Sequence, residues 1–206
     1  MEIKEKILSR ASELFMSQGV KNVTMDNLAA DLKMSKRTLY ELYENKEALV
    51  LETFKYIYLK ENKILKDIVR SSSNVIEALS TIINRKKEQF QSLNPIFIED
   101  LKKYIATTQA FFHSGENKPK EYSIMYLLLE KGMNEGIFRK DIRIDVVDIF
   151  FNELLFLVHN SKRMEISKLD DYTVLCNIFI PYFRGLCTLK GSEMIESIFS
   201  DKLNNN

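Results

Sequence analysis

Residues 24–49, TMDNLAADLKMSKRTLYELYENKEAL, contain two short helical patterns with only a few residues between them. Leu28 and Ala29 lie on the apolar face of the first pattern, and Leu39 and Tyr43 lie on that of the second. The small Ala29 side chain lets the two helices approach closely. This spacing is typical of a helix-turn-helix, in which the packed pair presents its second helix outward.

The start of this second helix carries groups that suit DNA. Ser35 is a good N-cap residue, and the next three residues, Lys36 to Thr38, then form the first helical turn. Arg37 can pair with O6 and N7 of guanine in a bidentate contact, and Lys36 can equally lie on a phosphate. The alternative is that the caps and lysines are ordinary surface features, and only the pattern of the whole segment favours DNA binding.

The helix starts at Thr24 and Asn45 are candidate contacts to the DNA backbone. Each residue can cap a helix, and the free amides and dipole of a helix N-terminus favour an anion there. Lys46 adds a full positive charge to the second start, and the Tyr40 hydroxyl can reach a phosphate. The predicted DNA-binding residues are Thr24, Ser35, Lys36, Arg37, Thr38, Tyr40 and Lys46.

The remainder of the chain also has the pattern of helices joined by short connections. Only six glycines and three prolines occur in 206 residues, and apolar residues recur at intervals of three and four. Besides the two short helices, we expect helices at 3–18, 45–70, 75–90, 95–113, 121–134, 145–162 and 171–189. The sequence therefore predicts an all-α chain with two domains. These are an N-terminal three-helix helix-turn-helix DNA-binding domain at 1–46 and a larger helical ligand-binding and dimerisation domain at 47–206.

The segments 145–162 and 171–189 are apolar nearly all round, so each must be covered on several sides. Two such helices in one chain suggest an intermolecular four-helix seam in a homodimer. The alternative is that both are central helices of a monomer. The residues predicted in the dimer interface are Phe150, Leu154, Ile178, Phe179 and Tyr182.

Charge and hydropathy limit where the protein acts and how it binds. The formal net charge is +1, and residues 1–46 hold eight basic against seven acidic side chains, so the DNA prediction depends on where the charges lie. The sequence has no run of eighteen apolar residues and no signal-peptide pattern at its N-terminus. We therefore expect a cytoplasmic protein.

The sequence offers no pattern of an enzyme or a metalloprotein. Its two histidines, His113 and His159, have no recognisable catalytic neighbours, and no glycine-rich phosphate loop occurs. Cys176 and Cys187 fall in one expected helix, about 16 Å apart along its axis, so they cannot pair within it. Packing in the core is their expected role. We expect no catalytic residue, no metal and no cofactor.

The quoted stretch resembles the TetR family of repressors. The signature of that family is a Thr before the first short helix, an Ile-Ala or Leu-Ala pair, a Gly-Val-Ser turn, a Thr-hydrophobic-Tyr core and an aromatic-x-x-Lys ending. The matching residues here are Thr24, Leu28 with Ala29, Ser35, Thr38 to Tyr40, and Tyr43 to Lys46. More faintly, residues 132–141 resemble the turn before the family's first dimerisation helix, and residues 182–186 resemble the end of its second.

Four positions depart from the family's pattern. Lys33 and Met34 stand where Gly-Val is usual, so the turn is expected to be helical or mildly strained. Glu41 and Leu42 stand where aromatic residues or His commonly contact DNA. A carboxylate near phosphates is unfavourable unless it accepts from cytosine N4 or pairs with a neighbouring basic group. The departure concerns sequence specificity more than DNA binding itself.

The resemblance implies a dimeric regulator that binds operator DNA and releases it when a small molecule changes the spacing of the two recognition helices. Repression is the usual mode of the family, so we expect a repressor. The helix at 45–70 is the expected lever. A small, largely apolar effector is expected to contact Phe90, Tyr104, Phe111, Tyr122, Tyr126, Met133 and Phe156, although each of these also suits the core. The alternative regulator is a protein partner, which an exposed apolar patch without a closed pocket would favour.

Overall fold

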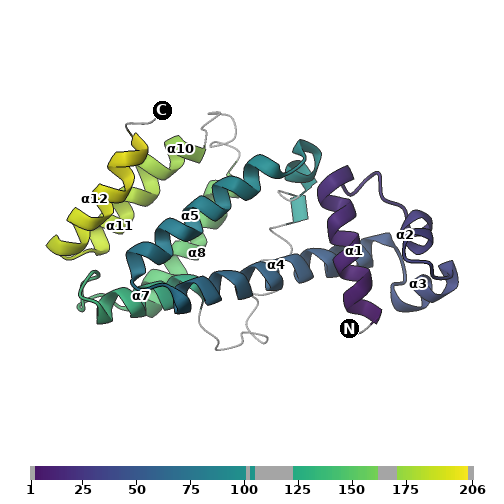
Figure 1. The fold of residues 1–206 in the computed structure, drawn as a ribbon, viewed down its shortest axis with the longest axis horizontal. Helices are drawn as coiled ribbons and strands as arrows, with labels where there is room; N and C mark the ends of the chain where they lie inside the picture. Colours follow the sequence, from purple (N-terminus) through teal and green to yellow (C-terminus); the bar gives the residue numbers. More distant parts are fainter. Residues whose placement is uncertain (1–2, 101–102, 105–122, 162–170, 204–206) are drawn as a thin grey trace. The chain divides into compact units, whose positions relative to one another are not determined.

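The computed structural model describes residues 3–100, 103–104, 123–161 and 171–203, and its regular elements are helices (Figure 1). The described helices are α1 (Ile3–Gln18), α2 (Met25–Asp31), α3 (Lys36–Leu42), α4 (Lys46–Ser71), α5 (Val75–Ser92), α7 (Ile124–Asn134), α8 (Ile144–Asn160), α10 (Asp171–Val174), α11 (Ile180–Leu186) and α12 (Leu189–Leu203). The all-α prediction is confirmed. None of these helices has the length and apolar character that a membrane span needs.

The described residues fall into two compact units. One lies within Met1–Lys63 and Lys87–Lys118, and the other within Ile64–Lys86 and Pro119–Asn206. All described residues before position 47 belong to the first unit, which also includes the first part of α4. Each unit has a hydrophobic core of its own.

The core of the first unit joins the three N-terminal helices to α4. Phe15 from α1, Leu28 from α2 and Leu39 from α3 have no exposed surface, and Phe54 from α4 is 2% exposed. Phe97 stacks on Phe54 with ring centroids 5.8 Å apart. Local periodicity places these side chains on one face of each helix, and their burial assembles the unit.

Residues 95–100 are helical, as expected, and they pack against the end of α1. Gly19 has a φ of +79°, so it ends α1 in the left-handed conformation that favours glycine. A Cβ at Gly19 would lie 2.6 Å from Cγ2 of Ile96, so this position also needs the small residue because of packing. The Val20 amide donates to Oδ2 of the buried Asp100 at 2.7 Å.

In the second unit, the turn after α7 packs against the turn after α11. Gly136 has a φ of +70° and ends α7. A Cβ at Gly132 would lie 2.3 Å from the Phe138 ring, so this ring packs directly against the helix backbone. Phe138 and Cys187 form an isolated antiparallel bridge. Burial raises the pKa of the Cys187 thiol to about 11, which agrees with its expected core position.

The prediction of one α-helix over 171–189 is wrong in two respects. Leu175–Phe179 is a π-helical turn between α10 and α11, just before Pro181, whose ring nitrogen has no proton for the helical ladder. The helix then ends at Leu186, and Thr188 accepts from the Gly191 amide at 3.1 Å at the start of α12. The helix at 189–203 was not predicted.

Candidate nucleic-acid interface

The helix-turn-helix prediction is confirmed by both caps and core. Oγ1 of Thr24 accepts from the Asn27 amide at 3.1 Å and begins α2, and Oγ of Ser35 accepts from the Thr38 amide at 3.1 Å and begins α3. Leu39 lies on the inner side of α3 with no exposed surface. Because Leu39 faces the core, the opposite side of α3 faces away from it, and α3 lies next to α2 (Figure 1).

The turn between these helices contains a strained residue. Lys33 has a φ of +54°, and among the described residues no other residue except glycine has a positive φ. The Lys33 amide donates to Ala30 O at 3.1 Å, and the Met34 amide donates to Ala29 O at 3.0 Å, which together form a Schellman motif. Of the two expected forms, helical or mildly strained, the strained one is found.

The outward side of α3 carries polar and charged groups. The side chain of Arg37 is 88% exposed and that of Lys36 is 64% exposed. Tyr40 is 48% exposed. Thr38 is half-buried, and its hydroxyl lies 2.8 Å from that of Ser35. These predicted residues are accessible, while the hydroxyls of Thr38 and Ser35 also shape the helix start.

Both cations at the start of α3 are paired with carboxylates. Nε of Arg37 donates to Oε1 of Glu41 at 2.8 Å, one helical turn further along. Lys36 forms an ion pair with Asp26, which lies on α2. The positive potential of this surface is therefore reduced in the free protein.

An ion-pair cluster that the sequence patterns did not reveal ties α1 to α2. The Arg10 guanidinium donates to both carboxylate oxygens of Asp31, at 2.5 and 2.9 Å, and to Glu13 at 2.7 Å. The hydrogen bond from Arg10 holds the pKa of the Asp31 carboxyl below its usual value. Arg10 and Asp31 are 21 positions apart, so no local spacing rule pairs them.

The start of α4 lies against the loop that follows α1. Oδ1 of Asn45 accepts from the Ala48 amide at 2.9 Å, which confirms the predicted cap. Nζ of Lys46 donates to the Lys21 carbonyl at 3.2 Å, and its side chain is half-buried. Lys46 therefore has a structural contact in addition to its predicted role on a phosphate.

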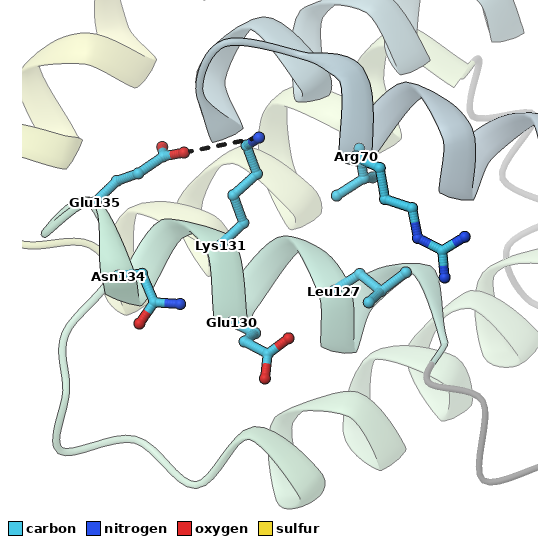
Figure 2. A pocket seen from close by; sticks show the side chains of 7 residues that line it. Arg70, Leu127, Glu130, Lys131, Asn134 and Glu135 are labelled. Carbon is cyan, nitrogen blue, oxygen red and sulfur yellow. Dashed lines mark ion pairs between the residues drawn. The ribbon is translucent and has the colours of Figure 1, made fainter.

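A pocket of about 340 Å³ opens on the second unit between the last turn of α4 and α7 (Figure 2). Its lining residues are Val69, Arg70, Leu127, Glu130, Lys131, Asn134 and Glu135. Nζ of Lys131 donates to the Ser72 carbonyl at 2.6 Å and lies 4.0 Å from the Glu135 carboxylate. The lining is mixed in charge and contains none of the residues predicted to contact an effector.

The predicted effector-binding residues are distributed over both units. Tyr104 stacks on Phe54 in the first unit, with ring centroids 4.9 Å apart. Tyr126 and Met133 lie on α7 in the second unit, and Met133 packs against its core. Phe111 and Tyr122, and the side chains of Phe90 and Phe156, lie outside the described residues. The effector site therefore remains a prediction.

The predicted dimer residues lie on α8, the π-helical turn and α11. Phe150 is 53% exposed, and its ring centroid is 5.4 Å from that of Tyr182. Leu154, Ile178 and Phe179 are half-buried. The large apolar side chains that α8 leaves exposed are Val146, Ile149, Phe150 and Leu157. They fall at helical spacing, so α8 has apolar surface along one side.

Residues 7–53 match the family model of the bacterial regulatory proteins, tetR family. The uncharacterized HTH-type transcriptional regulator YvaF of Bacillus subtilis (strain 168) is 33% identical over 101 residues, 48% of this chain and 53% of the relative. The chain therefore spans about half the length of YvaF. The HTH-type transcriptional repressor KstR2 of Mycobacterium tuberculosis is 22% identical over 150 residues, 72% of this chain and 75% of that protein.

Among solved structures, the reduced form of Escherichia coli NemR superposes with a TM-score of 0.53 and 14% sequence identity. The match covers 91% of this chain and 98% of NemR. At this identity the likeness concerns the fold. It extends the similarity beyond the helix-turn-helix to the helices that follow.

Proposed function

We propose that the chain is a transcription regulator of the tetR family, whose model its residues 7–53 match, and that it binds operator DNA as a dimer and responds to a small-molecule effector. One observation carries the DNA-binding part. The α3 helix is fixed to α2 through the fully buried Leu39, while Arg37 and Tyr40 project from its other side. A helix held in this way can enter the major groove.

Dimerisation is supported by the apolar surface of α8 and α11. A second copy packed on Phe150 and its neighbours would remove this apolar area from water, and burial of a Phe or Leu side chain contributes roughly 1.5–3 kcal/mol. Two copies would present two α3 helices to half-sites about 34–36 Å apart. Binding to operator DNA would place the protein in the cytoplasm.

Regulation by an effector and the repressor mode are proposed from the family. KstR2 is named as a repressor, and we infer the same sign for this chain. The proposed effector is small and largely apolar, and it would favour one spacing of the recognition helices by about 1–3 kcal/mol. The comparisons give no support to the alternative of a regulatory protein partner.

The deciding experiment is selection of bound sequences from random duplex DNA. We expect an enriched palindrome whose two half-sites are one helical turn apart. Compounds can then be screened for release of that duplex, with an unrelated DNA-binding protein on its own site as the control. If no sequence is enriched at moderate salt, the proposed function is wrong.

A further inference from the structure

The Arg37–Glu41 pair on α3 leaves part of the arginine available for DNA. A guanidinium has five N–H groups, and Glu41 accepts only the one on Nε. Among the described residues Arg37 has no second partner, and its side chain is 88% exposed. The two terminal nitrogens therefore remain available, and they can donate together to O6 and N7 of one guanine.

The Arg37–Glu41 pair contributes little to the stability of the free protein. Both side chains are largely exposed, and pairs of this kind contribute little to stability because water screens them. In a groove of the duplex the screening falls, and the hydrogen bond from Nε then restricts the orientation of the guanidinium plane. The Glu41 carboxylate also repels phosphates, so an Arg37 side chain turned toward the backbone would bring its partner close to negative charge.

We propose that Glu41 is a positioning residue that sets sequence specificity: it holds the Arg37 guanidinium toward a base edge and away from the phosphates. This rests on the proposed DNA-binding function and names a residue that determines its specificity. Glu41 acts through Arg37 and does not itself read a base.

The Lys36–Asp26 pair provides a matched control on the same surface. Asp26 also neutralises a cation of α3, but its partner is a lysine, whose ammonium is a point charge without a preferred plane. Glu41→Gln and Asp26→Asn each remove one negative charge and keep the size of the side chain. They differ in the cation that loses its partner: the guanidinium of Arg37 has a preferred plane, and the ammonium of Lys36 does not.

The experiment uses the full chain and the duplex selected from random DNA. Dissociation constants are measured by fluorescence anisotropy for the wild type, Glu41→Gln, Asp26→Asn, Arg37→Gln and the double variant Glu41→Gln/Arg37→Gln. The probes are the selected duplex, its single-base variants and an unrelated duplex, each over a range of salt concentrations. Circular dichroism melting checks that every variant is folded.

Both carboxylate variants should bind the unrelated duplex about threefold to tenfold more tightly and steepen the salt slope by about one, since each frees one cation for a phosphate. Only Glu41→Gln should also lose base preference, by about fivefold or more, at the base pair where Arg37→Gln loses it. The double variant should match Arg37→Gln in base preference, because Glu41 acts through Arg37.

Two results would overturn the assignment. If Glu41→Gln strengthens binding to all duplexes equally, as expected for Asp26→Asn, Glu41 contributes charge alone. If Glu41→Gln changes base preference in the Arg37→Gln background, Glu41 reads a base directly. In either case the wild type still selects a sequence, so these failures are distinct from failure of the proposed function, in which no sequence is enriched.

Discussion

The α2–α3 pair and the α8–α11 surface differ in how completely the chain buries its own apolar side chains. In the first region Leu28 and Leu39 have no exposed surface. In the second, Phe150 and Leu157 are more than half exposed, although α8 is the more apolar element. The first region is complete within one chain, whereas the second has apolar surface that a second copy would cover in the proposed dimer.

The difference bears on which function each region can perform alone. DNA recognition needs a rigid helix, and a buried leucine with two capped helix starts provides one locally. Correct spacing of two recognition helices needs two chains. Changes in the first region should therefore affect folding and contacts of one protomer, while changes in the second should affect assembly and, through it, operator affinity.

The largest expected effect is that of Leu39→Ala. Leu39 is fully buried between α3 and the rest of the core, and removal of a buried leucine side chain costs about 2–5 kcal/mol of unfolding free energy. Chemical denaturation should show this loss. Tyr40→Phe, at the neighbouring exposed position, is the control and should leave stability nearly unchanged. Equal stability of Leu39→Ala and wild type would mean that α3 is not seated as the structure shows.

Phe150→Asp should act on assembly. A carboxylate placed in an apolar interface weakens association by about 2–4 kcal/mol, or about thirtyfold or more in the dimer dissociation constant. Sedimentation should show monomers, and operator affinity should fall with them. Leu59→Asp is a control, because Leu59 on α4 is 54% exposed and outside the predicted interface. An unchanged dimer in Phe150→Asp would remove this residue from the interface.

Local chemistry made much of the first region predictable. Thr24, Ser35 and Asn45 begin helices as predicted, because a cap depends on residues only three positions away. The absence of a glycine in a tight turn predicted a helical or a mildly strained form at Lys33, and the structure has the strained one. What these residues have in common is that sequence neighbours determine their conformation.

Features that depend on distant residues were missed or only partly predicted. The Arg10–Asp31 pair joins two helices, and nothing in the spacing of the sequence identifies it. The segment 171–189 reads as one helix because its hydrophobic pattern continues beyond Leu186, while the chain turns there to form the bridge between Phe138 and Cys187. The predicted effector residues were chosen by residue type, which does not distinguish a cavity from a core.

Lys46→Ala should weaken binding to all duplexes alike and reduce the salt slope by about one, because a phosphate contact carries no sequence information. Arg37→Ala is the matched comparison and should mainly relax preference at one base pair. The Lys46 contact to the Lys21 carbonyl adds a small loss of stability, which thermal melting can measure separately. If both variants bind every duplex as the wild type does, neither residue contacts DNA.

Lys33→Gly should give the smallest change in stability, and it should raise stability where Leu39→Ala lowers it. The left-handed conformation costs an L-residue about 1–2 kcal/mol, and the added freedom of glycine in the unfolded chain offsets about 0.5–1 kcal/mol of that. With a φ of +54° at Lys33, the variant should therefore be more stable by up to about 1.5 kcal/mol in thermal unfolding. Lys33→Ala keeps the Cβ while removing the charge, so it should gain nothing. If both variants gain stability equally, the cause is removal of the lysine charge, and the turn is not strained.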